Sequence, residues 1–300
     1  MMRPVKSMFI LTLCAVLTMT ACTANRNRQT PPEQNGTARQ QSQAPEPSPG
    51  AAAGNAPNRL QAYAATPQLH SGSESATRKN VPLSLADLHQ KYRSTFLFNG
   101  PSWKRQAALT FDDVPDTRFT PMVLDVLKKY GVKATFFVVG NRAEAHPDMV
   151  KRIIAEGHVI GTHSYSHSNL IKLDDARFRD EILRTEKILG DMIGYTPRLF
   201  RPPYGNVNEQ QILWLASQKN YIINWNVDSL DWKGLNADQV AANVLGHIVP
   251  GCVILQHAAG GVGQDLTGTV EALPRIIEQL KAQNIQLVTV PELFDIPKEK

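Results

Sequence analysis

The sequence predicts an α/β protein whose parallel strands form a seven-stranded (β/α) barrel related to the eight-stranded TIM barrel. From Ala107 onward, short apolar runs alternate with amphipathic stretches of helical period, which is typical of parallel strands joined by right-handed crossovers. Polar residues able to do chemistry follow five of the runs, as expected where barrel strands end. No phosphate-binding glycine fingerprint follows the first run, which disfavours a nucleotide-binding sheet.

The apolar runs and the stretches between them define the expected elements. Helix termini show the usual asymmetry, with Pro147 at one start and Gly131, Gly157 and Gly194 just after three ends. Residues 81–104 are predicted as a lead-in with a short helix capped by Ser84. The predicted strands are residues 107–111, 134–139, 158–160, 198–200, 221–227, 252–256 and 286–290. The predicted helices are residues 120–130, 147–156, 174–193, 208–219, 237–249 and 269–284.

Residues 1–22 have the pattern of a secretory signal. A basic start is followed by an apolar run too short for a comfortable membrane span, and small residues precede Cys22. Ala21-Cys22 resembles the lipobox of bacterial lipoproteins, although Met19 stands at the usual leucine position, and this predicts Cys22 as the lipidated N-terminus. Ordinary cleavage and an uncleaved anchor are the alternatives. We therefore expect an exported protein, lipid-anchored to the outer face of the bacterial cell membrane.

The rest of the chain divides into a tether and one large domain. Residues 23–80 are rich in Pro, Gln, Ala, Asn, Ser and Gly and are predicted to be disordered, whereas residues 105–296 carry the periodic pattern. The formal net charge of +5 suits an anionic surface such as a cell wall or membrane. No basic block is interleaved with aromatic residues, so we expect no nucleic-acid partner. Cys252 lacks a metal-spaced partner and is predicted to be a small buried hydrophobe in a monomer.

Two adjacent carboxylates, Asp112 and Asp113, end the first predicted strand and would repel each other without a cation nearby. A metal ion bound by one would leave the other free as a base. His163 and His167 follow the third strand at a spacing of four, which places both imidazoles on one face of a helical turn. Alone, such a pair is more often a pair of surface or loop residues. With Asp113 it completes a two-histidine, one-carboxylate set, the arrangement of catalytic zinc or another divalent ion.

Five groups of polar residues at strand ends together resemble the five motifs of the polysaccharide deacetylase family, the NodB-like or family 4 carbohydrate esterases. In order they are Thr110-Phe-Asp-Asp113, the pair His163 and His167, Arg201-Pro-Pro-Tyr204, Asp231-Trp232 and Leu255-Gln-His257. The resemblance covers residues 105–296 and is greatest to bacterial peptidoglycan N-acetylglucosamine deacetylases. It implies a distorted (β/α)7 barrel that removes N-acetyl groups from peptidoglycan and releases acetate.

The resemblance also implies how the paired carboxylates divide their roles. Asp113, His163 and His167 would hold a divalent metal ion, zinc in the first place, with cobalt or nickel as alternatives. Asp112 would be the general base, and Arg201 would pair with Asp112 and fix its orientation. Hydrolysis of an unactivated acetamide needs both a strong nucleophile and a place for negative charge, which such a centre supplies.

The remaining motif residues are implied to act on the other side of the acetyl carbonyl. The backbone N–H of Tyr204 would bind the oxyanion. An amine leaves only when it is protonated, so His257 would be the general acid, with Asp231 raising its pKa. Trp232 and Leu255 would line an apolar slot for the acetyl methyl group. Taken singly, each of these residues could equally be a core aromatic, a turn cap or a satisfied buried histidine.

Two alternatives to peptidoglycan deacetylation stay open at this point. The same fold could deacetylate chitin oligomers or acetylxylan, or the chain could be a catalytically idle wall-binding lipoprotein. One departure from the family's pattern bears on substrate choice and rate. Most members have Gly-Pro after the paired aspartates, whereas Val114-Pro115 stands here. A branched side chain beside the metal could narrow the cleft or restrict the backbone.

Overall fold

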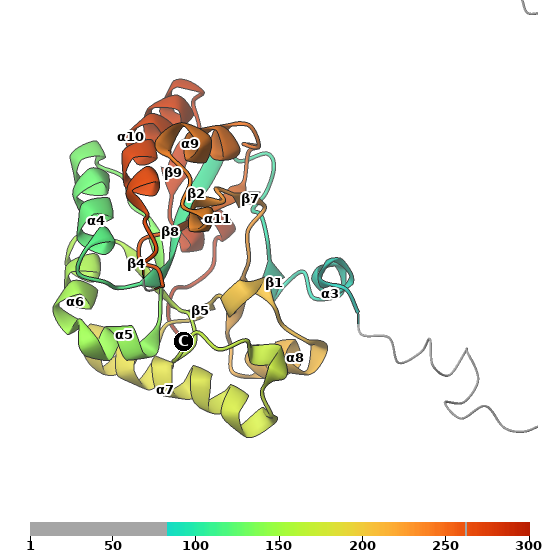
Figure 1. The fold of residues 1–300 in the computed structure, drawn as a ribbon. Coiled ribbons are helices and arrows are strands. Elements are labelled where there is room, and N and C mark those ends of the chain that lie inside the picture. The colour runs from blue at the N-terminus through green and yellow to red at the C-terminus, as the bar shows by residue number, and fades with distance from the viewer. Residues whose placement is uncertain (1–82, 262) are drawn as a thin grey trace, which may run out of the picture. The chain divides into compact units, whose positions relative to one another are not determined.

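One sheet, in which every pairing between named strands is parallel, organises the protein (Figure 1). This computed structural model describes residues 83–261 and 263–300, so the predictions for residues 1–22, the tether and Cys22 fall outside the described residues. The strand order is β1-β6-β5-β4-β3-β2-β8-β7, and β9 pairs with β2. The strands are β1 (Phe96–Leu97), β2 (Gln106–Val114), β3 (Thr135–Val138), β4 (Val159–Thr162), β5 (Leu199–Phe200), β6 (Tyr221–Ile223), β7 (Val227–Asp228), β8 (Cys252–His257) and β9 (Gln286–Val288).

Helices connect most successive strands, and Figure 1 shows α4, α6, α7 and α10 along the outside of the sheet. Ser84 and Asn208 close capping boxes at the starts of α3 and α8, and Gly131 and Gly194 end α4 and α7 in the left-handed conformation. The α-helices are α3 (Leu85–Lys91), α4 (Phe119–Tyr130), α5 (Gly140–Ala145), α6 (Pro147–Ala155), α7 (Asp175–Ile193), α8 (Glu209–Ser217), α9 (Ala237–Leu245), α10 (Thr267–Ala282) and α11 (Val290–Phe294). Short 3-10 turns are η1 (Leu170–Lys172), η2 (Pro203–Gly205) and η3 (Asp231–Lys233).

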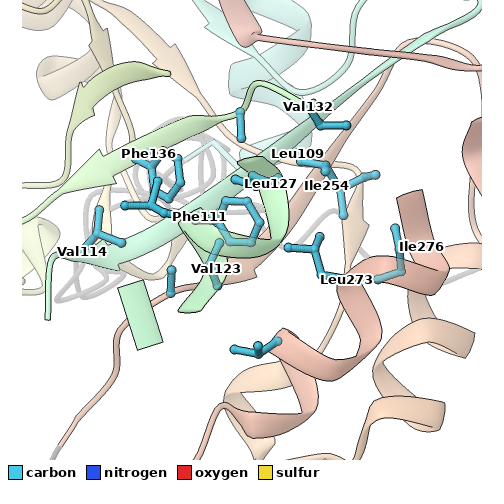
Figure 2. Close-up of a cluster of buried hydrophobic side chains, with 14 of the residues drawn as sticks. Leu109, Phe111, Val114, Val123, Leu127, Val132, Phe136, Ile254, Leu273 and Ile276 are labelled. Carbon is cyan, nitrogen blue, oxygen red and sulfur yellow. The ribbon is translucent and has the colours of Figure 1, made fainter. Parts of the chain in front are cut away.

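The largest hydrophobic cluster lies between the sheet and the helices that follow its central strands. In the middle of β2, Leu109 and Phe111 are fully buried against α4 and α10 (Figure 2). Phe111 stacks on Phe136 of β3, with ring centroids 5.2 Å apart. Other members labelled in Figure 2 are Val114, Val123, Leu127, Val132, Ile254, Leu273 and Ile276. This cluster fixes the position of β2, at whose end the paired aspartates lie.

The observed elements follow the predicted alternation, with differences at a few places. Each predicted strand overlaps an observed one, but the segment predicted as one strand, residues 221–227, carries two strands, β6 and the start of β7, because the chain changes partners. Asn224 N donates to Leu97 O beside β1, whereas Asn226 N donates to Val253 O of β8. The strand β1 and the helices α5 and α11 were not predicted. Residue Val290, expected at the end of a strand, instead begins α11, because Thr289 and Glu292 form a capping box there.

Two further properties concern Cys252 and the helices of the described residues. Cys252 is free and buried, as predicted, and burial raises the pKa of its thiol to about 11. Among the described residues, the helices are all too short or too polar to cross a membrane.

We expect Gly251→Ala to destabilise the domain by about 3 kcal/mol or more, because overpacking adds to backbone strain. Gly251 has φ of +86°, and a Cβ there would lie 2.5 Å from the carbonyl oxygen of Gly100. Gly194 is a matched control, since its φ of +83° is similar but a Cβ would meet nothing within 4 Å. For Gly194→Ala we expect a loss of only about 1 kcal/mol. Urea unfolding of both variants measures the difference, and equal losses would show that the contact with Gly100 is unimportant.

Candidate active site

A cavity of about 610 Å³ lies at the carboxyl ends of the strands. It is bordered by residues of β2, β7 and β8 and of the segments that follow each strand from β3 to β8. Eight of the site residues predicted from the sequence line this cavity: Asp112, Asp113, His163, His167, Tyr204, Trp232, Leu255 and His257. Two others, Arg201 and Asp231, are buried and contact lining residues from behind. The structure therefore brings together residues that are up to 145 positions apart in the sequence, from Asp112 to His257.

The two aspartates reach the same cavity because the strand is irregular at Asp113. In a regular strand, neighbouring side chains point to opposite faces, so Asp113 would share the core-facing side of Leu109 and Phe111. Instead Asp113 has φ of +65°, and the register between β2 and β3 shifts between Phe111 and Val114. Because of this bulge, the side chain of Asp113 borders the cavity together with that of Asp112. The side chain of Val114 occupies the position on the core face that Asp113 would have in a regular strand.

Of the two effects considered for Val114, narrowing of the cleft is therefore wrong. Its side chain is fully buried in the hydrophobic cluster (Figure 2). It is not among the residues that line the cavity. The left-handed conformation of Asp113 costs about 1–2 kcal/mol for a residue with a Cβ, although aspartate tolerates it better than most. Burial of Val114 offsets part of this cost, since a fully buried valine contributes about 1.5 kcal/mol or more.

His163 and His167 meet through a loop, and the predicted helical turn is absent there. His163 directly follows β4, and His167 has φ of +59°. The loop is held by its own polar groups, since the hydroxyl of Ser164 accepts from the N–H of His167 at 3.0 Å. From α7, the Glu181 carboxylate accepts from the N–H of Tyr165 at 2.8 Å. The two imidazole centroids are 5.0 Å apart.

Asp113, His163 and His167 form a group whose possible ligand atoms all lie within 4.8 Å of one another. Asp113 Oδ1 is 3.1 Å from His167 Nε2 and 3.5 Å from His163 Nε2. It is buried, and within the described chain it accepts no hydrogen bond of acceptable geometry. Burial alone would raise the pKa of the Asp113 carboxyl, but the two histidines lower it well below its usual range. A carboxylate facing two imidazole nitrogens without a donor fits a cation site.

The protonation state of His163 also fits a metal ligand. Its Nδ1 lies 2.7 Å from the carbonyl oxygen of Arg201. A carbonyl can only accept, so Nδ1 carries the proton and Nε2 presents its lone pair toward Asp113. Burial lowers the pKa of His163, which favours the neutral imidazole. A donor set of two imidazoles and one carboxylate suits zinc and other divalent first-row metals.

Asp112 is held separately from Asp113 by a buried guanidinium. Arg201 is fully buried, and its Nη1 donates to Asp112 Oδ1 at 2.7 Å and to Thr110 Oγ1 at 2.8 Å. Its other two nitrogens donate to main-chain carbonyls, Nε to that of Ile223 at 2.9 Å and Nη2 to that of Asn224 at 3.3 Å. The carboxylate of Asp112 is thus fixed in orientation, while its Oδ2 lies 3.8 Å from His163 Nε2. The two adjacent aspartates have different partners.

On the neighbouring strand, His257 pairs with a buried aspartate. Asp112 and His257 are register partners in β2 and β8. Asp231 Oδ1 is 2.7 Å from His257 Nδ1, and its Oδ2 accepts from the N–H of His257 and the hydroxyl of Thr269. Burial alone would lower the pKa of His257, but the charge and hydrogen bond of Asp231 raise it to about 9. His257 is therefore protonated at neutral pH in the metal-free protein and can donate a proton into the cavity.

Aromatic and apolar residues complete the walls. Tyr204, with φ of +61°, is 60% exposed, and its ring centroid is 4.9 Å from that of His167. Trp232 in η3 is 47% exposed, whereas Leu255 is buried at the cavity floor. Large exposed aromatic rings beside a polar cluster are suited to contact the apolar faces of a ligand.

Several residues that line the cavity were not predicted from the sequence. Trp225 and Gln264 line the cavity, and Gln264 Nε2 donates to the carbonyl oxygen of Trp232 at 3.2 Å. Asp228 also lines it, while its Oδ1 accepts from a backbone N–H in a turn. Arg142 is the most informative omission. It follows the end of the second predicted strand, and the same strand-end rule applied there would have identified it.

Comparison with known proteins gives strong matches over the described domain. A family model described as polysaccharide deacetylase matches residues 99–222. A peptidoglycan-N-acetylglucosamine deacetylase of Bacillus cereus is 49% identical over 211 residues, covering 70% of this chain and 75% of that protein. Peptidoglycan-N-acetylglucosamine deacetylase PgdA of Listeria monocytogenes is 38% identical over 225 residues, covering 72% of this chain. The match spans only 46% of the Listeria protein, less than half of its length.

A solved structure agrees with the fold. The crystal structure of a peptidoglycan N-acetylglucosamine deacetylase, in complex with 4-naphthalen-1-yl-N-oxidanyl-benzamide, superimposes with a TM-score of 0.70 at 47% identity. The superposition covers 73% of this chain and 100% of that one. It confirms the fold class predicted from the sequence, a curled parallel sheet with helices in the manner of a distorted (β/α)7 barrel.

The pairing of His257 with Asp231 can be tested in the metal-free protein by NMR titration of histidine side chains. We expect a pKa near 9 for His257. In Asp231→Asn the charge and hydrogen bond that raise the pKa most are gone, while burial and the weaker attraction of Asp112 and Asp113 remain, so the pKa of His257 should fall well below 9. His158 is an internal control, because burial lowers its pKa to about 4 and it does not contact Asp231. An unchanged His257 pKa in Asp231→Asn would contradict this electrostatic account.

Proposed function

The chain belongs to the polysaccharide deacetylase family, and we propose that it is a metal-dependent enzyme that removes N-acetyl groups from N-acetylglucosamine residues of peptidoglycan, releasing acetate. Membership confirms the resemblance carried by the five sequence motifs. One observation carries the proposal: a single cavity combines a three-residue cation site with a separately held carboxylate and a histidine of raised pKa. These are the groups that amide hydrolysis requires.

Asp113, His163 and His167 would hold the divalent cation. When bound, the cation supplies Lewis-acid chemistry, lowering the pKa of water and polarising the acetyl carbonyl. Asp112 would take the proton of the attacking water. Its carboxylate is suited to this, since Arg201 fixes one oxygen at 2.7 Å, the other lies 3.8 Å from His163 Nε2, and the residue lines the cavity.

His257 would donate a proton to the leaving amine nitrogen. Asp231 keeps the imidazole protonated and oriented through the 2.7 Å contact with Nδ1, so that Nε2 carries the proton toward substrate. The backbone N–H of Tyr204 would bind the oxyanion, and Trp232 and Leu255 would contact the acetyl methyl group. In this scheme Asp112 gains a proton from the water, and His257 gives a proton to the amine. Asp112 therefore ends the reaction protonated and His257 ends it neutral.

The substrate class follows from the relatives and from the charge of this chain. The Bacillus cereus and Listeria monocytogenes relatives bear the name of peptidoglycan N-acetylglucosamine deacetylases. A formal net charge of +5 favours approach to an anionic cell wall. Zinc is the first choice of cation, with cobalt and nickel as alternatives, because imidazole and carboxylate ligands accept all three.

We expect the protein to release acetate from peptidoglycan when zinc, cobalt or nickel is supplied. Asp112→Asn keeps the size of the side chain and an oxygen for Arg201 but removes the base, so kcat should fall by about 10²–10⁴-fold. Asp116→Asn is the control, because Asp116 only accepts backbone N–H groups at the start of α4, and an amide oxygen can replace it. Acetate is measured with peptidoglycan, chitin oligomers and acetylxylan in parallel.

Each outcome of this assay separates the alternatives. Faster release from chitin oligomers or acetylxylan would replace peptidoglycan as the substrate while keeping the chemistry. Background release from all three polymers would favour an idle wall-binding protein. Full activity in Asp112→Asn would contradict the role of Asp112 as base.

The same proposal includes export and membrane attachment of a monomeric enzyme through a lipid on Cys22. Support comes from the basic and apolar pattern of residues 1–22 and the Ala21-Cys22 sequence. Cys22→Ala should release the protein from the membrane fraction, whereas Cys14→Ala, a change within the predicted signal, should leave it attached. Retention of Cys22→Ala on the membrane after cleavage of the signal would rule out the lipid anchor.

A further inference from the structure

The short helix α5 contacts the loops that carry the candidate metal ligands. At its start, the N–H of Gly140 donates to the carbonyl oxygen of Ser164 at 3.0 Å, and the N–H of Asn141 donates to that of Tyr165 at 2.9 Å. Both acceptors lie in the loop between His163 and His167. A Cβ on Gly140 would lie 2.8 Å from Tyr165 Cδ2, so the close approach of helix and loop requires glycine.

The side chain of Arg142, the next residue of α5, reaches two other segments of the site. Its Nη1 donates to the carbonyl oxygen of Asp113 at 2.7 Å, and its Nη2 donates to that of Gly260 at 2.8 Å. Gly260 lies three residues after His257, which ends β8. Arg142 is partly buried and borders the cavity. One guanidinium thus joins the end of β2 to the segment after β8.

We propose that Arg142 is a positioning residue that holds Asp113 in the conformation needed to bind the cation. Asp113 presents its carboxylate to His163 and His167 only because its backbone is left-handed, with φ of +65°. The orientation of the Asp113 carbonyl is set by the same backbone torsions, and Arg142 anchors that carbonyl with a charged hydrogen bond. The inference rests on the proposed metal site and adds a residue that acts through Asp113 without contacting the cation.

The charge of Arg142 makes this role distinguishable from simple electrostatics. A guanidinium near a cation site repels the cation, so charge alone predicts tighter metal binding when Arg142 is removed. Positioning predicts the opposite, because a ligand that is free to leave its strained conformation binds metal less well. The direction of the change therefore decides between the two.

The geometry also explains why lysine would be a poor replacement. Arginine presents several N–H groups in a fixed planar fork, and here Nη1 and Nη2 donate to separate carbonyls of Asp113 and Gly260. An ammonium group is compact and sits on a flexible stem, so it would satisfy one carbonyl more readily than both. Arg142→Lys therefore keeps the positive charge but loses the simultaneous hydrogen bonds to Asp113 and Gly260.

The experiment measures Co²⁺ binding to the metal-stripped protein without glycan, by calorimetry and by the visible absorption bands of the bound ion. We expect Arg142→Ala to weaken Co²⁺ affinity by about 10–100-fold and to change the absorption bands, with Arg142→Lys intermediate. Arg152→Ala is the matched control. Arg152 lies on α6 and donates to Asp125 and Glu156. It does not line the cavity, so the Co²⁺ affinity and absorption bands of Arg152→Ala should equal those of the wild type.

Binding and folding are read separately in this design. Urea unfolding of each variant reports any loss of stability, and a purely structural role would lower stability while leaving the affinity and the spectrum of the folded protein unchanged. Equal or tighter Co²⁺ binding by folded Arg142→Ala would overturn the proposal. If that variant does not fold, wild-type affinity and spectrum in Arg142→Lys would overturn it equally.

The same titration distinguishes this inference from the proposed function. Wild-type protein that binds Co²⁺ without releasing acetate would contradict the enzymatic proposal alone, and the comparison of variants would still hold. If the wild-type protein binds no Co²⁺, or if Asp113→Ala binds Co²⁺ as tightly as the wild type, the proposed metal site is wrong. The proposed role of Arg142 is then wrong as well.

Discussion

The alternation of side chains along a strand is the constraint on which the site depends. Two adjacent carboxylates at the end of β2 should point to opposite faces, yet both border one cavity. The bulge at Asp113 resolves this conflict, and it affects both the hydrophobic core and the contacts of the Asp113 backbone. Val114 completes the hydrophobic core in the place that Asp113 vacates, while the displaced carbonyl of Asp113 finds a donor in Arg142. The irregular backbone at Asp113 thus determines both how the core is filled at the end of β2 and how the site is arranged there.

Burial of charge is the second requirement, and the protein meets it by giving the buried charged groups several hydrogen-bond partners each. A buried guanidinium is costly unless it is paired and hydrogen-bonded. Arg201 donates to a carboxylate, a hydroxyl and two backbone carbonyls, and its guanidinium carbon lies 4.1 Å from the ring centroid of Phe137. Asp231 is buried in a similar way, with His257 and Thr269 as donors. Such networks fix the orientation of Asp112 and His257 before any ligand arrives.

Much of this arrangement could be predicted from the sequence, because it depends on period and strand order. The alternation of apolar runs and helical stretches predicted the parallel fold, and the strand-end rule predicted that residues as distant as Asp113 and His257 would meet. What could not be predicted depends on backbone conformations that no period reveals. The two histidines were expected on a helical turn, but left-handed residues in a loop bring them together. The pattern did contain one clue, since a polar Asp113 on the core face and an apolar Val114 next to it indicate a bulge.

The double use of Arg201 bears on how activity can be lost during evolution. Its side chain holds Asp112, whereas its backbone carbonyl fixes the tautomer of His163. A side-chain substitution cannot remove a backbone carbonyl, so the orientation of the metal ligand is insulated from changes that disable the base. A descendant could therefore lose catalysis by one substitution at Asp112 and retain a cavity that binds cation and glycan. Loss of the base and loss of the cation site are therefore separable events in this architecture.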